Sequence, residues 1–122
     1  MPFAPSILIE HIDQCVAACK SPNSFFMLKT FYALKKKLKN IEACVHVDGT
    51  IRAQTLLRKH NPLYHDVIMQ FYKDTGVPAV LNTSFNRHGL PMVCAPEDAI
   101  GHLEDRCVDI LFINNMIVER GR

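Results

Sequence analysis

A helix end, an apolar strand and a polar loop follow one another in Thr75-Gly76-Val77-Pro78-Ala79-Val80-Leu81-Asn82-Thr83-Ser84-Phe85-Asn86. Gly76 suits a left-handed cap at the end of a helix, and Pro78 just beyond it cannot continue that helix. Residues 77–81 are continuously apolar, which predicts a buried strand. Ligands of open α/β sheets gather at the carboxyl ends of strands. The loop at 82–91 is therefore the first candidate for a functional site.

One helix precedes this strand and another follows the loop. Asn61 is a favourable N-cap, and Pro62 suits the first helical position. Apolar residues spaced four apart predict the buried face of this helix: Leu63, Val67 and Phe71, with Tyr64 and Ile68 beside them. Pro96 opens the second helix, since proline fits a first turn and the acids at 97 and 98 favour its positive end.

Short strands are expected in the rest of the chain. Aromatic, apolar or alternating runs predict them up to residue 10 and at 25–31, 43–47, 51–56, 110–113 and 116–118, with a short helix at 11–20. The turn pair Asp48-Gly49 predicts a hairpin between 43–47 and 51–56. The alternation of strands and helices indicates an α/β or α+β domain.

The run at 51–56 is expected to be half exposed. It alternates one set of side chains, Ile51, Ala53 and Thr55, with another, Arg52, Gln54 and Leu56. Successive side chains of a strand point to opposite faces, so one set is predicted to face the core and the other to face outward.

Length and composition favour a single globular domain over residues 1–122. The chain has 122 residues, 48% hydrophobic and 21% charged, which argues against disorder. The net charge of +2 creates no strong field toward nucleic acid or a membrane. No apolar run approaches the roughly 20 residues that a membrane helix needs.

Lysines are concentrated near residue 36. Lys35, Lys36, Lys37 and Lys39 could form a nucleic-acid patch or a solvated helix or loop face. We favour the solvated face, because no aromatic residues are interleaved as in single-strand-binding proteins. No nucleic-acid partner is expected.

Five cysteines and no visible secretory signal indicate a cytoplasmic protein. We expect all the thiols to be reduced and at least three to be largely buried, Cys44 and Cys107 having apolar neighbours. Cys15 and Cys19 would share one helix face but lack two further ligands nearby. Because a structural zinc site needs four ligands, no metal site is predicted.

Two segments carry groups that suit an anionic ligand. In the loop, hydroxyl, amide and arginine donors between Asn82 and His88 are of the kind that binds phosphate. The other segment is the Asp48-Gly49 turn with Thr50 and Arg52, which suits an anion or a nucleotide sugar. For each segment the structural alternative stays open: a turn whose polar side chains bond to their own backbone.

Three motifs resemble the C-terminal region of the carbamoyltransferases of the nodulation and antibiotic-tailoring type. They are Pro2-Phe3-Ala4-Pro5-Ser6-Ile7-Leu8, His46-Val47-Asp48-Gly49-Thr50-Ile51-Arg52-Ala53-Gln54 and Thr75 to Asn86 as quoted above. The segments from Gly89, Pro96 and Val108 continue the match, so the resemblance runs in register over nearly the whole chain.

The resemblance implies a YrdC-like α/β domain: a twisted mixed sheet with flanking helices, incomplete at its N-terminus. In the family this domain follows a larger kinase-like domain of the same polypeptide, related to Kae proteins. It forms carbamoyl-adenylate from carbamoyl phosphate and ATP, and the carbamoyl group passes to an acceptor hydroxyl. Magnesium enters with ATP as a substrate complex, and no tightly bound cofactor is expected.

The resemblance also implies which residues bind the substrates. Arg52 matches the arginine expected to hold phosphate or the carbamoyl group, and it is the predicted catalytic residue. Ser84 and Asn86 match residues that face the nucleotide phosphates. Further binding residues are expected in the same motifs: Asp48, Thr50, Asn82 and Thr83. We expect Arg52, Ser84 and Asn86 to converge on one cleft, since both motifs must reach one ligand.

Two alternatives remain at this stage. One is a threonylcarbamoyl-adenylate synthase-like domain, which the long first two motifs disfavour. The other is a non-catalytic module that binds nucleotide or docks to a kinase-like partner. The basic residues that the family carries just upstream of the first motif are missing, so the chain resembles a fragment. The isolated chain is therefore expected to be inactive or weakly active.

Overall fold

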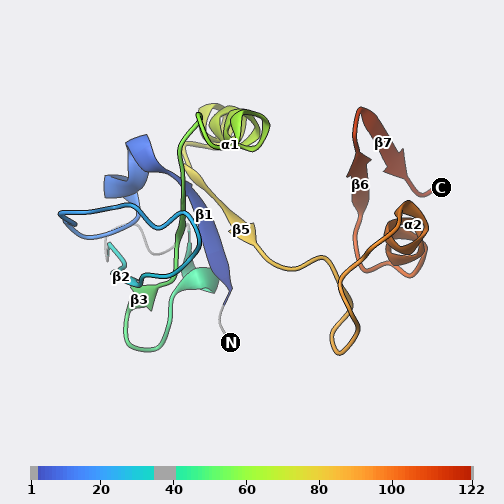
Figure 1. Cartoon of the computed structure of the whole chain (residues 1–122), viewed down its shortest axis with the longest axis horizontal. Coiled ribbons are helices and arrows are strands. Elements are labelled where there is room, and N and C mark those ends of the chain that lie inside the picture. The colour runs from blue at the N-terminus through green and yellow to red at the C-terminus, as the bar shows by residue number, and fades with distance from the viewer. Residues whose placement is uncertain (1–2, 35–40, 122) are drawn as a thin grey trace. The chain divides into compact units, whose positions relative to one another are not determined.

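The structure, a computed structural model, describes residues 3–34 and 41–121 (Figure 1). The chain forms two compact units, Met1–Thr83 and Ser84–Arg122, and each is described by itself. That the whole chain is one domain stays a prediction. The lysines at 35–37 and 39 lie outside the described residues, so the interpretation of them as a solvated face stays a prediction as well.

The first unit is built on a three-stranded sheet. Its strands are β1 (Ala4–Leu8), β4 (Gln54–Leu56) and β5 (Ala79–Asn82), in the order β4-β1-β5. β1 runs parallel to β4 and antiparallel to β5. All five residues of β1 are buried, as expected for a central strand covered on both faces. The α/β class with a mixed sheet is thus confirmed.

Helix α1 (Pro62–Thr75) covers one face of this sheet (Figure 1). Its predicted caps are confirmed: the Asn61 side chain accepts a hydrogen bond from the Tyr64 N–H, and Gly76 is left-handed with φ of 73°. Ile68 is fully buried and packs in one cluster with Leu8 and Leu56. This cluster joins the helix to two of the three strands.

The predicted buried face of α1 is confirmed for Tyr64 and Ile68 and wrong for Leu63, Val67 and Phe71. The helix buries the row of Tyr64, Ile68 and Tyr72 and leaves Leu63, Val67 and Phe71 exposed at 77%, 57% and 40%. Both rows are apolar at i,i+4 spacing, so periodicity alone did not separate them. The buried ring of His65 also lies on the inner side of the helix, with Nε2 2.6 Å from Glu10 Oε1.

The other face of the sheet packs on short elements. Ile7 and Ala79 share a cluster with residues of β2 (Phe31–Tyr32) and β3 (Thr50–Ile51), two strands that pair antiparallel. Two short 3-10 helices, η1 (Ile9–Gln14) and η3 (Glu42–Cys44), flank them. The first unit therefore has a core on each side of its sheet.

Three predicted elements are wrong. Residues 25–27 form a turn and a bend, and within 25–31 only Phe31 belongs to a strand. Met27 takes a positive φ of 56°, which strands do not adopt. Residues 43–47 contain the end of η3 and the start of a turn instead of a strand. The predicted hairpin is therefore absent at 43–47, and β3 pairs with β2. The helix expected at 11–20 is η1 alone, with Cys15 buried and Cys19 exposed after it. Aromatic and apolar content favours a strand only where the side chains pack, and here Phe26, Leu28 and Val47 stay exposed.

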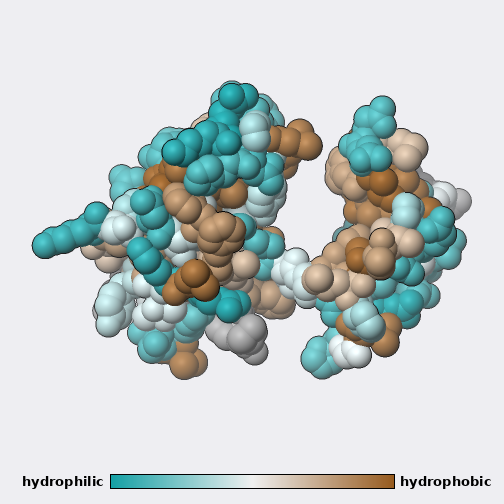
Figure 2. Space-filling view, viewed as in Figure 1, coloured by the Kyte–Doolittle hydropathy of each residue, from teal (hydrophilic) through white to brown (hydrophobic). Residues whose placement is uncertain are grey.

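The second unit contains helix α2 (Pro96–Glu104) and a hairpin of β6 (Ile110–Ile113) and β7 (Met116–Glu119), as predicted. The Asp98 carboxylate accepts hydrogen bonds from the backbone N–H groups of Cys94 and Ala95, which hold the pKa of Asp98 below its usual range. Large apolar side chains of the hairpin stay exposed, and Figure 2 shows hydrophobic surface on each unit.

The thiols differ from expectation in their burial. Cys15 and Cys44 are buried, whereas Cys19, Cys94 and Cys107 are exposed, so the prediction of at least three buried thiols is wrong. Cys107 lies in the bend after α2, and its neighbour Val108 packs against the small core of the second unit while Cys107 itself stays exposed. Desolvation by burial raises the pKa of the Cys44 thiol, which makes that cysteine a poor nucleophile. Within the described residues no helix is long and apolar enough to cross a membrane.

Replacing Ile68 by alanine is expected to destabilise the first unit by about 2–5 kcal/mol, because it opens a cavity between α1 and the sheet. Val67→Ala on the same helix is the matched control and should change stability by no more than about 0.5 kcal/mol, since Val67 is exposed. Urea unfolding followed by circular dichroism measures both. Equal costs for the two variants would contradict the observed burial of α1.

Candidate functional site

The side chain of Gln54 joins the three motifs of the sequence. Its Oε1 accepts a hydrogen bond from the Ser6 hydroxyl at 2.8 Å and another from the Asn82 Nδ2 at 2.8 Å. Its Nε2 donates to the Phe25 carbonyl at 3.2 Å. Ser6 lies in β1, Gln54 in β4 and Asn82 at the end of β5, so one amide spans the whole sheet.

These residues form a polar row on the face of the sheet that α1 covers. Side chains two apart in a strand share a face, so Ser6 lies on the side of Leu8, and Gln54 on the side of Leu56. Leu8 and Leu56 pack beneath α1. The sheet face is thus apolar under the helix and continues as the polar row of Ser6, Gln54 and Asn82, where a polar ligand can be bound.

Arg52 and Gln54 are both partly exposed, in contrast to the residues between and beside them. Ile51, Ala53 and Thr55 are buried at 1% exposure or less, whereas Arg52 and Gln54 are half-buried. The predicted alternation of burial is confirmed except at Leu56, which α1 covers. The single strand predicted over 51–56 is wrong, because Ile51 ends β3, Gln54 begins β4, and the two strands belong to different sheets. Arg52 adds a fixed positive charge to the same motif as Gln54, and guanidinium suits phosphate or carboxylate oxygens. That it lies beside the polar row stays a prediction.

The turn before Arg52 is held by its own side chains. The Asp48 carboxylate accepts hydrogen bonds from the Thr50 hydroxyl at 2.7 Å and the Thr50 N–H at 2.9 Å. The Thr50 hydroxyl also lies 3.0 Å from His46 Nδ1. The hydrogen bonds from Thr50, and then the nearby His46, lower the pKa of Asp48. Ligand binding by Asp48 and Thr50 stays a prediction, while their role in shaping the turn is observed.

The loop motif is divided between the two units. Asn82 and Thr83 end the first unit, and Ser84 and Asn86 begin the second. The Ser84 hydroxyl donates to Asn86 Oδ1. Because Arg52 belongs to the first unit, its convergence with Ser84 and Asn86 stays a prediction.

Asn86 organises the loop of the second unit. Its Nδ2 donates to the carbonyls of Arg87 and Leu90, both at 2.9 Å. Its side-chain oxygen accepts from Ser84, so the amide closes the turn at 87–90 on itself. The Ser84 oxygen keeps lone pairs for a further donor, such as a cation or a protonated ligand group.

His102, which the sequence did not single out, anchors this loop to α2. It is buried, its Nε2 accepts the Arg87 N–H at 3.1 Å, and its Nδ1 lies 2.7 Å from the Asp98 carbonyl. That pattern needs a neutral ring with the proton on Nδ1. The Phe85 ring meets His102 edge to face, with centroids 5.3 Å apart. No motif marks a histidine near a helix end, so only tertiary structure reveals this role.

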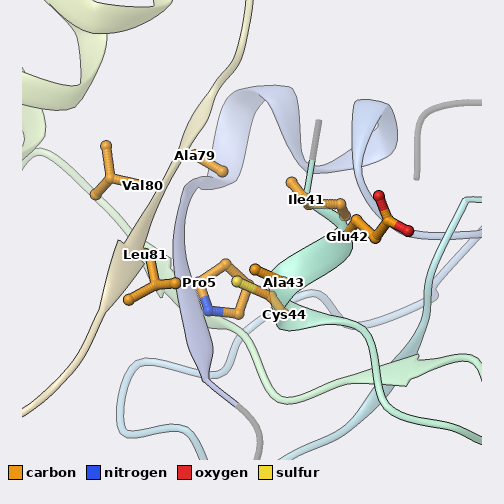
Figure 3. Close-up of a pocket in the computed structure, with 8 residues that line it drawn as sticks. All are labelled: Pro5, Ile41, Glu42, Ala43, Cys44, Ala79, Val80 and Leu81. Carbon is orange, nitrogen blue, oxygen red and sulfur yellow. The ribbon is translucent and has the colours of Figure 1, made fainter. Parts of the chain in front are cut away.

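A cavity of about 530 Å³ lies on the side of the sheet opposite the polar row (Figure 3). Pro5 and Ala79 to Leu81 form one wall, and Ile41 to Cys44 form the other. Its lining is largely apolar, with Glu42 as the one charged residue, and the Cys44 sulfur points toward Pro5. A site with a single negative charge does not suit phosphate, so the polar row is the stronger candidate.

Comparison with known proteins identifies the family. The family model described as "Carbamoyltransferase C-terminus" matches residues 1–120. The chain belongs to this carbamoyltransferase C-terminus family. The resemblance drawn from the three motifs is therefore confirmed, and the residues of the polar row come one from each of those motifs.

Relatives of this carbamoyltransferase segment are much longer. An uncharacterized protein of Methanocaldococcus jannaschii is 40% identical over 121 residues, covering 98% of this chain and 23% of that protein. The nodulation protein NolNO of Sinorhizobium fredii is 35% identical over 98% of this chain and 18% of its own length. The 3'-hydroxymethylcephem-O-carbamoyltransferase of Amycolatopsis lactamdurans is 26% identical over 75% of this chain and 18% of its own length. The chain thus spans about a fifth of these relatives.

Gln54→Leu is expected to cost about 1–3 kcal/mol of stability, because the fully buried Ser6 hydroxyl loses its acceptor. Gln70→Leu is the matched control: Gln70 bonds to Asp74 on the exposed side of α1, and its loss should change stability by about 0.5 kcal/mol at most. Chemical denaturation measures both. A Gln54→Leu protein as stable as the Gln70→Leu protein would show that the polar row is not held by this amide.

His102→Phe is expected to free the loop from α2 while keeping the ring contact with Phe85. Loss of one hydrogen bond, worth about 1 kcal/mol, should raise the exchange rate of the Arg87 amide hydrogen by roughly fivefold to tenfold. Hydrogen–deuterium exchange read by nuclear magnetic resonance measures it, with exposed His88→Phe as control. An unchanged Arg87 rate in His102→Phe would disprove the anchor.

Proposed function

We propose that this segment is the carbamoyl-adenylate-forming part of a larger carbamoyltransferase, with carbamoyl phosphate and the magnesium complex of ATP as its substrates. The observation that supports this most is the meeting of the three family motifs at the Gln54 amide, two residues along the chain from Arg52. A polar row beside one fixed cation is the arrangement that phosphate chemistry uses.

The reaction needs charge stabilisation more than a nucleophile. Carbamoyl phosphate and water give carbamate and inorganic phosphate. A carbamate oxygen then forms a bond to the α-phosphorus of ATP, the bond to the bridging oxygen breaks, and pyrophosphate leaves. Negative charge is spread over phosphoryl oxygens throughout, so positioning and neutralisation supply the catalysis. Arg52 is the proposed catalytic residue, and magnesium arrives with the nucleotide.

The other motif residues take two kinds of role in this proposal. Asn82, Ser6 and Gln54 hold one another and fix the floor of the site. Asp48 and Thr50 hold the turn that leads into Arg52. Thr83, Ser84 and Asn86 contact the nucleotide phosphates from the loop. The carbamoyl group then passes to an acceptor hydroxyl in a kinase-like domain of the same polypeptide, which we propose to be cytoplasmic.

A non-catalytic module is the second candidate. It is favoured by the internal hydrogen bonds that occupy Asp48, Thr50 and Asn86. Such a module would bind nucleotide, or dock to the kinase-like domain, without turning over carbamoyl phosphate. The experiment below separates it from the catalytic proposal.

Arg52→Ala in the polypeptide that carries this segment together with its kinase-like domain should lower carbamoyl-phosphate-dependent exchange of pyrophosphate into ATP by at least about 10²-fold. Arg58→Ala is the matched control, because Arg58 pairs with Asp66 on the surface of the first unit, at 66% and 49% side-chain exposure. Its exchange rate should stay within about twofold of the unmodified protein, since surface pairs contribute little.

Equal rates for Arg52→Ala and Arg58→Ala would remove Arg52 from the site. No exchange in the unmodified polypeptide, together with nucleotide binding, would establish the non-catalytic module. The 122-residue chain alone is expected to bind ATP weakly and to show little or no exchange. The resemblance implies basic groups just upstream of the first motif; each charge-assisted hydrogen bond from such a group is worth about 1.5–3 kcal/mol, and two of them amount to roughly two to four orders of magnitude in affinity.

A further inference from the structure

The two edges of the first unit's sheet differ in how they are covered. At the β4 edge, the Thr55 N–H donates to the Ser24 carbonyl at 3.1 Å, and the Ser24 N–H donates to the Thr55 hydroxyl at 2.8 Å. The opposite edge strand is β5, which lies beside β1 (Figure 1) and pairs with no other strand among the described residues. A free edge presents N–H and C=O groups to which a further strand can pair.

The register of β1 on β5 decides which backbone groups face this free edge. Opposite residues of an antiparallel pair alternate between hydrogen-bonded and non-hydrogen-bonded positions. The Leu8 N–H donates to the Pro78 carbonyl at 3.1 Å, so the next hydrogen-bonded position on β5 is Val80. Leu81 lies opposite Pro5, which has no N–H, at a non-hydrogen-bonded position. The N–H and C=O groups of Leu81 therefore point away from β1, toward the free edge.

The apolar cavity of about 530 Å³ adjoins this edge (Figure 3). Leu81, which is 44% exposed, lines it together with Pro5, and residues 41–44 form the facing wall. Side chains directly opposite each other on neighbouring strands share a face of the sheet. An apolar side chain placed opposite Leu81 on an added strand would therefore face the cavity. Glu42 is exposed and is the one charged residue of the lining, so it favours a basic residue nearby.

We infer that the free edge of β5 and this cavity bind a strand from the part of the polypeptide that precedes this segment. The family is that of a C-terminus, and the chain covers only 18–23% of the longer relatives, so most of each relative precedes it. A sheet of three strands is also small beside the usual average of about five or six. The docked strand carries an apolar side chain toward the cavity and a basic one near Glu42. This docking needs no adenylation chemistry and goes beyond the proposed function.

Amide hydrogen exchange tests the docking in the 122-residue chain and in the longer polypeptide, with single amides resolved by electron-transfer fragmentation and mass spectrometry. The Leu81 amide should exchange at least about fivefold to tenfold more slowly in the longer polypeptide, the effect of one added hydrogen bond. The Val80 amide, which points to β1, is the internal control and should be protected similarly in both. A Leu81 amide that exchanges equally fast in both proteins would overturn the docking.

A matched pair of variants tests the role of the cavity. Ala43 lines it and is exposed, and Ala18 is an exposed alanine of the same unit outside the lining, so neither tryptophan variant is expected to unfold the chain. In the longer polypeptide, Ala43→Trp should fill the cavity, displace the strand and return the Leu81 amide to the fast exchange of the 122-residue chain. Ala18→Trp should leave Leu81 protected. Equal Leu81 exchange rates in the two variants would refute the docking into this cavity.

A second copy of the chain is the other strand donor that the test distinguishes. Light scattering of the 122-residue chain should give the mass of a monomer, with the Leu81 amide unprotected at every concentration. A dimer whose Leu81 protection disappears on dilution would assign the edge to a second copy and refute the docking. Protection of Leu81 in a longer polypeptide without pyrophosphate exchange would keep the docking and refute the proposed function, and the reverse result would do the opposite.

Discussion

The side-chain amide of Gln54 is the interaction on which the first unit's candidate site depends. It bonds to Ser6, Asn82 and Phe25, and so it fixes β1, the end of β5 and the segment at 24–26 relative to β4. Ser6 is fully buried, and a buried hydroxyl without an acceptor would be costly. The three strands are therefore held in one register, with the polar row on the face of the sheet that α1 covers.

Much of the fold was predictable because local signals agreed with tertiary packing. Helix α1 has its cap at Asn61 and its left-handed Gly76, and the hairpin after α2 turns at Asn114, which has a positive φ of 53°. The prediction failed at 25–31, where the chain is attached to β4 by hydrogen bonds from distant residues, and at 43–47, where local hydrogen bonds form a 3-10 helix and a turn. It was only partly right for the face of α1, because two apolar rows at i,i+4 spacing lie side by side on the helix and periodicity alone does not separate them.

The site was predicted in part. The alternation around Arg52 correctly predicted that its side chain is partly exposed. The strand end at Asn82 was expected to carry a polar group. Gln54 and Ser6 lay inside the quoted motifs but were not chosen, since a glutamine that bridges three strands has no local signature. The role of His102 rests on its hydrogen bond with Arg87, which is distant in sequence, so no spacing rule finds it. Family membership supports carbamoyl transfer by the longer relatives, and the polar row supplies a physical basis for the adenylation step proposed here.

The most direct measurement is a crystal structure of the longer polypeptide with magnesium, carbamoyl phosphate and an ATP analogue that cannot release pyrophosphate. The account predicts that the Arg52 guanidinium lies within hydrogen-bond distance, about 2.7–3.2 Å, of a phosphate or carbamoyl oxygen. A nucleotide whose phosphates and carbamoyl group lie out of hydrogen-bond reach of Arg52 would contradict the account.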